Sequence, residues 1–350
     1  MESGDIMLQL KKPKRLNKGD TIALVSSSSG LAGEPTMKHR TTLGIKRIEE
    51  MGYKVKVMPN ALKGLAFNYD HPKARAEELM AAFIDPEVKA IISTLGGDDS
   101  VRLLPYLDFE IISQHPKIFM GYSDSTFTHF VCLKAGFSSF YGLSLLTDFA
   151  ENNAFPEYSR NHFNKTLTQN EIIGDIPTSD FVYKHGLSWD KENELIDREK
   201  IDNTGYDVVN GKGQASGPLI GGCLELMISL RGTDVYPDET DFDGAILFLE
   251  TSEVLMPQWL MEDFMRSLGA LGTLDRINGI IFGRPQNGDL YDEYKEVVQK
   301  IMKEWGHEDK PVLFNASFGH NEPKCIVPYG RNAVIDADNK TFIITENAVE

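Results

Sequence analysis

Cysteine is scarce in this 350-residue chain. The three cysteines, Cys132, Cys223 and Cys325, form no C-x-x-C pair and no spacing typical of a metal site. They are too few for a disulfide framework, so we expect small buried side chains in a reducing compartment. The H-E-x-x-H motif and the nucleotide-binding motifs G-x-x-x-x-G-K-[ST] and G-x-G-x-x-G are also missing. We therefore expect neither a metal nor another cofactor.

Positive charge and long apolar runs are also in short supply. The chain has 36 basic and 52 acidic residues, and this balance disfavours binding to nucleic acid through phosphate contacts. No apolar run approaches the ~20 residues of a membrane helix, and the N-terminus lacks the apolar segment of a signal peptide. Hydrophobic residues make up 41% of the chain, which is typical of a globular protein. We expect a cytoplasmic protein without nucleic-acid or membrane partners.

Strand-like and helix-like segments alternate in the first part of the chain. The apolar stretches "TIALV", "VKAIIS" and "KIFMG" are separated by helical patterns such as "TMKHRTTLGIKRIEEMGY" and "PKARAEELMAAFIDP". This α/β alternation predicts a mostly parallel sheet with helices on both faces. Polar loops follow the strands, namely "SSSSG", "TLGGDDS" and "GYSDST". Because ligands bind beyond the carboxyl ends of such strands, we expect these loops to meet at one crevice.

The composition divides the chain into three parts. Residues 1–165 form a first domain, and residues 166–214 are polar and charge-rich, with an isolated Trp189, which indicates a linker or a functional loop. Residues 215–350 form a second domain, with apolar strands in "GAILFLE", "INGIIFG" and "PVLFNASFGH" and a closing hairpin.

Ser123 stands between an apolar strand and a helical pattern, and two interpretations are open. A serine on such a turn can be a nucleophile, but the signature G-x-S-x-G fits only in part, since Ser125 replaces the second glycine. Serine and aspartate are also preferred helix caps, so Ser123, Asp124 and Ser125 can equally cap the helix that follows. A nucleophile needs a base and an orienting group as well.

Candidates for those partners lie at two later strand ends. His320 follows "VLFNASFG", and Glu250 ends "GAILFLE", with Glu253 as a nearby alternative. A loop histidine bonded to backbone and an acid that caps a turn are the ordinary alternatives. The order serine, acid, histidine also occurs in α/β-hydrolases.

An oxyanion would need two backbone N–H groups aimed at one point. The N–H of Asp124, directly after the serine, is one candidate. Gly96 or Gly97 can supply the second, because glycine allows close backbone approach to a ligand. An ordinary turn at the two glycines is the alternative.

Seven segments, taken in order, resemble the LD-carboxypeptidase family of serine peptidases, peptidase family S66. They are "STLGGDDSVRLLPYLD", "PKIFMGYSDST", "FYGLSLL", "GPLIGGCLELM", "ILFLETSE", "IIFGRP" and "FGHNEPKCIVPYG". The resemblance implies a triad of Ser123, Glu250 and His320, with Gly97 and Asp124 at the oxyanion hole and Gly96 against the substrate. It also implies a Rossmann-like or flavodoxin-like N-terminal domain, a β-rich, barrel-like C-terminal domain, a site between them and a homodimer.

Within that family, the length and the Trp189 segment are similar to the microcin C immunity (MccF-like) branch. This implies hydrolysis of the amide between a peptidyl or aminoacyl carboxyl and a modified adenylate, with Trp189 stacked on the base. Cys223 replaces the asparagine of many relatives, and we interpret it as a small residue at a helix start. Two alternatives remain: a muramoyltetrapeptide LD-carboxypeptidase of murein recycling, and a non-catalytic two-lobe protein that binds a small ligand.

Overall fold

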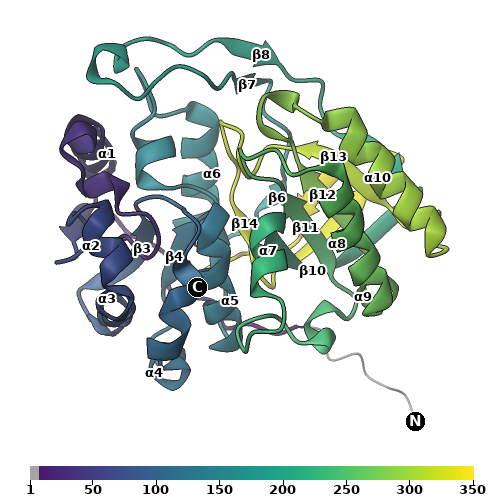
Figure 1. Ribbon diagram of the computed structural model, residues 1–350, viewed down its shortest axis with the longest axis horizontal. Helices are drawn as coiled ribbons and strands as arrows, with labels where there is room; N and C mark the ends of the chain where they lie inside the picture. Colours follow the sequence, from purple (N-terminus) through teal and green to yellow (C-terminus); the bar gives the residue numbers. More distant parts are fainter. Residues whose placement is uncertain (1–7) are drawn as a thin grey trace.

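A computed structural model describes residues 8–350 (Figure 1). Residues 1–7, the start of the predicted first domain, lie outside the described part of the chain. Two β-sheets organise the structure, and the helices from the first half of the chain lie on the opposite side of Figure 1 from those of the second half. The protein is a mixed α/β structure with a parallel-strand sheet and a separate sheet-rich C-terminal part, as expected.

The first sheet has the strand order β14-β5-β4-β3-β1-β2. Strands β1 to β5 run parallel, and β14 pairs antiparallel with β5. The order 2-1-3-4-5 is flavodoxin-like, and it reverses between β1 and β3. The strands are β1 (Thr21–Val25), β2 (Lys54–Val57), β3 (Val88–Ser93), β4 (Ile118–Gly121), β5 (Phe140–Tyr141) and β14 (Val327–Pro328).

Helices cover this sheet because its central strands are apolar on both faces. Every residue of β4 is buried, as expected of a parallel strand between two layers. The helix α3 begins at Pro72, a residue suited to the first helical turn, and buries Leu79 and Phe83. The helices are α1 (Lys38–Glu50), α2 (Leu65–Asp70), α3 (Pro72–Ile84), α4 (Phe109–Ser113), α5 (Thr126–Lys134) and α6 (Glu157–Leu167).

The second sheet has the order β6-β16-β15-β10-β11-β12-β13-β9. Its central strands β10 to β13 run parallel, and the outer strands pair antiparallel. The predicted closing hairpin is present as β15 and β16. The strands are β6 (Gly174–Asp175), β9 (Asp207–Asn210), β10 (Gln214–Cys223), β11 (Ile246–Glu250), β12 (Gly279–Gly283), β13 (Val312–Ala316), β15 (Asn332–Asp336) and β16 (Thr341–Ile344).

Four helices accompany the second sheet: α7 (Leu224–Leu230), α8 (Gln258–Ala270), α9 (Thr273–Arg276) and α10 (Tyr291–Glu304). Helix α10 turns one apolar stripe inward, burying residues such as Val298 and Ile301 at helical spacing. Within residues 8–350, no helix combines the length and the apolar character that crossing a bilayer requires.

The polar segment predicted as a linker is ordered into an arch that we name the strap, residues 176–206. It contains the hairpin β7 (Phe181–Tyr183) and β8 (Lys200–Asp202), and it crosses the top of Figure 1 from one half of the molecule to the other. Arg198 of the strap pairs with Glu151 and lies 3.2 Å from Glu322. The strap is therefore fastened to both halves of the molecule.

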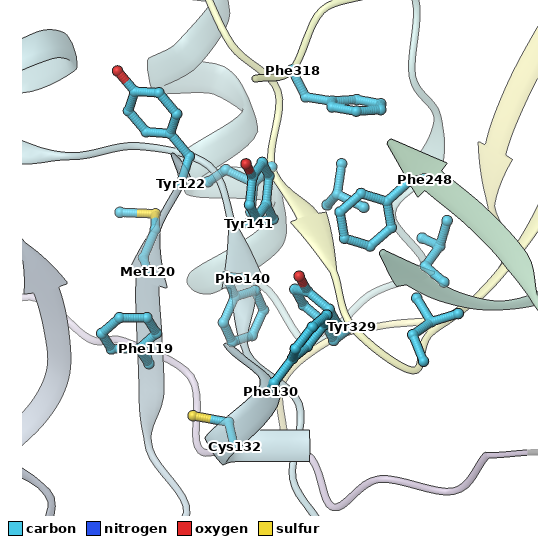
Figure 2. Close-up of a cluster of buried hydrophobic side chains, with 14 of the residues drawn as sticks. Phe119, Met120, Tyr122, Phe130, Cys132, Phe140, Tyr141, Phe248, Phe318 and Tyr329 are labelled. Atoms are coloured by element: carbon cyan, nitrogen blue, oxygen red, sulfur yellow. The ribbon is translucent and has the colours of Figure 1, made fainter. Parts of the chain in front are cut away.

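An aromatic cluster packs between the two sheets. Tyr141 contacts Phe248 at 5.6 Å between ring centroids, and Phe248 contacts Tyr329 at 5.0 Å. Figure 2 shows Tyr141 on one side of this cluster, with Phe248 and Phe318 on the other. These rings are fully buried, so the core continues from the first sheet into the second.

Candidate active site

The loops that follow β1, β3 and β4 line a single cavity of about 500 Å³. Each loop contributes a residue to the wall of the cavity: Ser28, Gly97 and Ser123. The second half of the chain contributes Glu225 and Glu253. The cavity lies where the strand order reverses, which is the usual ligand position in open α/β sheets. The predicted meeting of the three loops is confirmed.

Ser123 occupies a sharp turn between β4 and α5. Its φ of 61° lies in the left-handed region, which residues other than glycine seldom adopt outside functional turns. A Cβ on Gly96 would lie 2.8 Å from the Cβ of Ser123, so only glycine lets the loop after β3 come this close. Ser125 has an ordinary φ of -62°, which explains why the second glycine of G-x-S-x-G is dispensable here.

The side chains of this turn do not cap the following helix. Ser125 makes no capping hydrogen bond, and the carboxylate of Asp124 points elsewhere. Asp124 accepts hydrogen bonds from the hydroxyl of Ser28, from Ser100 Oγ at 2.7 Å and from the Ser100 N–H at 2.9 Å. Burial raises the pKa of Asp124, and the bonds from Ser28 and Ser100 oppose this. Asp124 thus ties the three cavity loops together.

His320 and Glu250 form a buried pair. The Nδ1 atom of His320 lies 2.7 Å from Oε2 of Glu250, and the backbone N–H of His320 donates to the same oxygen at 3.2 Å. Gly319 permits this contact, because a Cβ there would lie 2.5 Å from Oε2 of Glu250. A histidine whose Nδ1–H is held by a carboxylate presents its Nε2 for proton transfer.

Two further contacts were not predicted: one involves Tyr141, which the sequence did not single out, and the other Glu253, which it offered only as an alternative acid. Tyr141 donates a hydrogen bond to Oε1 of Glu250 at 2.5 Å and accepts one from the backbone N–H of Ser123 at 2.9 Å. Tyr141 lies in the segment "FYGLSLL", which is one of those that carry the family resemblance. That resemblance was the only indication in the sequence that this residue lies near the site.

The second contact is that of Glu253, whose Oε2 lies 3.0 Å from Nε2 of His320. Burial lowers the pKa of His320, but Glu250 and Glu253 outweigh burial and raise it to about 10. The contact with His320 lowers the pKa of Glu253 to about 2. Within residues 8–350, no hydrogen bond joins Ser123 to His320. The acid–histidine pair is therefore assembled, but the carboxylate of Glu253 lies against Nε2 of His320, the atom that would take the proton of Ser123.

Comparison with known proteins identifies the family to which the chain belongs. The family model for the LD-carboxypeptidase N-terminal domain matches residues 22–142, and the model for the C-terminal domain matches residues 216–335. The putative carboxypeptidase YocD of Bacillus subtilis is 31% identical over 336 residues, which covers 93% of this chain and 96% of YocD. The chain belongs to the LD-carboxypeptidase family, the S66 serine peptidases.

Other relatives of this chain have more specific names. The microcin C7 self-immunity protein MccF of Escherichia coli is 29% identical, with 94% of each chain covered. A probable murein peptide carboxypeptidase of Bacillus subtilis is also 29% identical, covering 97% of this chain and 96% of that one.

Solved structures agree with these relatives. An MccF-like protein of Streptococcus pneumoniae in complex with AMP has a TM-score of 0.87 and 34% identity, covering 94% of this chain and 99% of its own. MccF in complex with aspartyl sulfamoyl adenosine has a TM-score of 0.86 and 28% identity, covering 97% and 100% of the two chains. The fold is therefore that of MccF.

Cys223 lies beside the acid–histidine pair. It ends β10, directly before α7, and pairs with Glu250 in the strand register. Burial raises the pKa of its thiol well above the usual value, and Glu250 raises it further, so the thiol stays protonated and unreactive. One ligand atom each from Cys223, Glu250 and His320 lies within 4.8 Å of the others. Both Glu250 oxygens already have partners, so this arrangement suits a catalytic pair better than a metal.

Trp189 is not in the wall of the cavity. It is half-buried in the strap against α1, where the guanidinium carbon of Arg40 lies 4.5 Å from the centre of its ring. Its backbone carbonyl lies 3.1 Å from Nε2 of His39. The ring of Trp189 therefore packs on α1 and does not line the cavity.

Proposed function

We propose that this member of the LD-carboxypeptidase family is a serine hydrolase that cleaves the amide between a peptidyl or aminoacyl carboxyl and a modified nucleotide. The observation that carries the proposal is the buried His320–Glu250 pair beside a cavity that contains Ser123 on a strained turn. A nucleophile, a base and an orienting acid are the parts that acyl transfer to water requires.

In the proposed mechanism, His320 takes the proton of Ser123, and the serine oxygen attacks the amide carbonyl. Glu250 holds the imidazole through Nδ1 and stabilises the imidazolium that forms. His320 then protonates the leaving nitrogen, and water hydrolyses the acyl-enzyme. For these steps to occur, the carboxylate of Glu253 must leave Nε2 of His320, because a nitrogen that is already bound to a carboxylate cannot receive the proton of Ser123.

The oxyanion is assigned to the backbone N–H groups of Asp124 and Gly97. A Cβ built on Gly96 would lie 3.0 Å from Ser123 Oγ and 3.4 Å from the nitrogen of Asp124, so this glycine loop faces both reacting groups. Gly96 accordingly contacts the substrate in this proposal. Donors placed in advance at a developing negative charge are a major source of catalysis in such sites.

Nucleotide-bearing ligands of the relatives support the substrate class. MccF has been solved with aspartyl sulfamoyl adenosine and with glutamyl sulfamoyl guanosine, and the pneumococcal MccF-like protein with AMP. The two ligands of MccF join an aminoacyl group to a sulfamoyl nucleoside, and AMP is the nucleotide part alone. We assign Trp189 of the strap to the base of such a substrate.

A second candidate function is cleavage of the terminal D-alanine from a murein tetrapeptide. The relative named as a probable murein peptide carboxypeptidase favours it, because its identity to this chain equals that of MccF. The two substrates share the reaction and differ in the leaving group.

The proposal also includes the organisation of the protein. Residues 1–165 carry the nucleophile, residues 215–350 carry Glu250 and His320, and residues 166–214 join them. We further propose a homodimer in the cytoplasm, and sedimentation of the purified protein tests the dimer.

Mass spectrometry of reaction products tests the function. The protein is incubated with an aminoacyl sulfamoyl adenosine and, separately, with a murein tetrapeptide, and Ser123→Ala is the matched control. Release of free amino acid and sulfamoyl adenosine supports the first function. Release of D-alanine from the tetrapeptide alone transfers the assignment to the second. Tight reversible binding without hydrolysis of either substrate contradicts both and identifies a non-catalytic binding protein.

A further inference from the structure

Tyr141 lies where the turn of Ser123 meets the second half of the molecule. It ends β5, which runs parallel to β4 with Gly121 opposite Tyr141. Its fully buried ring packs against Phe248 at 5.6 Å and against His129 at 5.5 Å between ring centroids. Figure 2 shows the ring between the strand of the first sheet and Phe248. From this position the hydroxyl reaches both Ser123 and Glu250.

The two partners of this hydroxyl fix the direction of its proton. The backbone N–H of Ser123, at 2.9 Å, can only donate. The carboxylate oxygen Oε1 of Glu250, at 2.5 Å, accepts. Burial raises the pKa of Tyr141 well above its usual value, and Glu250 raises it further, so the hydroxyl keeps its proton. Tyr141 therefore donates to Glu250 and accepts from Ser123.

We propose that Tyr141 is a positioning residue that joins the turn of the nucleophile to the acid of the triad. The inference rests on the proposed roles of Ser123, Glu250 and His320. Since Tyr141 holds Oε1, the other oxygen of Glu250 is aimed at the ring and backbone N–H groups of His320. One hydroxyl thus orients the acid directly and the base through the acid.

The same hydroxyl also acts on the nucleophile. The φ of 61° at Ser123 is costly, and a satisfied N–H stabilises the turn that contains it. Because the N–H of Ser123 is directed to Tyr141, the next N–H, that of Asp124, is the donor that the turn leaves for an oxyanion. Tyr141 therefore influences how the serine and its oxyanion donor are presented.

Tyr329 offers a matched control for an ordinary buried tyrosine. It is also fully buried, contacts the same Phe248, and donates its hydroxyl hydrogen bond to the backbone oxygen of Gly221 at 2.6 Å. Removing this hydroxyl costs one buried hydrogen bond and leaves the partners of Tyr141 in place. A comparison of the two variants separates positioning from stability.

The experiment compares full-length wild type, Tyr141→Phe and Tyr329→Phe. The rate at which a fluorophosphonate probe labels Ser123 is measured across pH, together with kcat and KM for the cleaved amide. In Tyr141→Phe we expect labelling and kcat to fall about 10- to 100-fold, the range for loss of a hydrogen bond to a charged group, with KM unchanged.

The pH dependence of the labelling rate adds a measurement that would not change if Tyr141 served only to stabilise the fold. Without the Tyr141 hydroxyl, the Glu250 carboxylate keeps more negative charge facing His320, and the acidic limb of the profile moves to higher pH. We expect Tyr329→Phe to lower Tm and leave the limb in place. If Tyr141→Phe keeps the wild-type labelling rate and pH profile, and loses as much Tm as Tyr329→Phe, the inference about Tyr141 is wrong. The proposed function then still stands.

Two further outcomes are distinguishable. If the wild type neither hydrolyses the amides nor reacts with the probe at Ser123, the proposed function fails and the inference fails with it. If Tyr141→Phe does not fold, 3-fluorotyrosine at position 141 keeps the ring and strengthens the donor. The acidic limb then moves to lower pH, and an unchanged limb contradicts the inference.

Discussion

Glu253 places a carboxylate oxygen 3.0 Å from Nε2 of His320, on the opposite side of the ring from Glu250. The imidazole therefore lies between two carboxylates, which hold its pKa at about 10 against the opposing effect of burial. Nε2 is the atom that must take the proton of Ser123 in the proposed mechanism. Glu253 is largely exposed, so it can leave when a substrate enters the cavity.

Replacing Glu253 with glutamine should therefore change the pH dependence of the reaction. A base works only when deprotonated, and a raised pKa keeps His320 protonated until the pH approaches that value. Removal of one neighbouring charge should lower this pKa and move the acidic limb of kcat/KM down by about 1–3 pH units. The profile of Glu253→Gln is measured beside that of Glu192→Gln, an exposed acid of the strap. A lower kcat/KM at every pH would show that Glu253 assists the reaction instead.

The carboxylate of Asp124 should contribute strongly to stability, since it receives the hydrogen bonds that join three loops. We expect Asp124→Ala to lower the free energy of unfolding by about 2–4 kcal/mol, and Ser100→Ala to lower it by about 1 kcal/mol. Urea denaturation measures both. Equal losses in the two variants would contradict the assignment of Asp124 as the common tie.

Lys324 is a buried cation behind the site. Its Nζ lies 3.0 Å from Asp148 and 2.7 Å from Glu322. It also lies 4.1 Å from the ring centre of Tyr122, which packs on His320 in a T-shaped arrangement. Lys324→Met should cost about 3–5 kcal/mol of stability, because it leaves the buried carboxylate of Asp148 without its cation, while Glu322 keeps Arg198 and His185 as partners.

Thermal and urea unfolding measure the loss in Lys324→Met. The control is Lys303→Met, which changes an exposed lysine of α10 and should leave the free energy of unfolding nearly unchanged. A stable Lys324→Met variant would show that Asp148 becomes protonated at little cost and that Arg198 and His185 suffice as partners of Glu322.

Trp189 should distinguish the two substrates. Stacking on a base is worth about 1–3 kcal/mol, so Trp189→Ala should raise KM for an aminoacyl sulfamoyl adenosine about 5- to 150-fold. Cleavage of a murein tetrapeptide should not change, and Trp189→Phe should retain part of the affinity. If Trp189→Ala leaves both kinetic constants for the nucleotide substrate unchanged, the ring serves only to pack on Arg40.

The sheet and the crevice were predictable because they follow from local patterns. Alternating strands and helices imply a parallel sheet, and the polar loops after β1, β3 and β4 must then share one edge. The positions of Glu250 and His320 at strand ends indicated a site, and the structure brings the two side chains into contact.

The remaining features depend on contacts between distant segments, which no local pattern encodes. A single tyrosine in "FYGLSLL" gives no sign that its hydroxyl will reach a carboxylate 109 positions away. Glu253 was considered only as an alternative acid, since the conformation of its loop decides which nitrogen of His320 it meets. Trp189 was assigned by resemblance, and its packing on Arg40 is a property of the folded strap.

The turnover of Ser123→Ala on the amide that the wild type cleaves tests the central claim most directly. The account predicts that kcat falls about 10⁴-fold or more, as in other triads that lose the nucleophile, while circular dichroism and Tm stay close to those of the wild type. Near-normal turnover by the folded variant would contradict the assignment of Ser123 as the nucleophile.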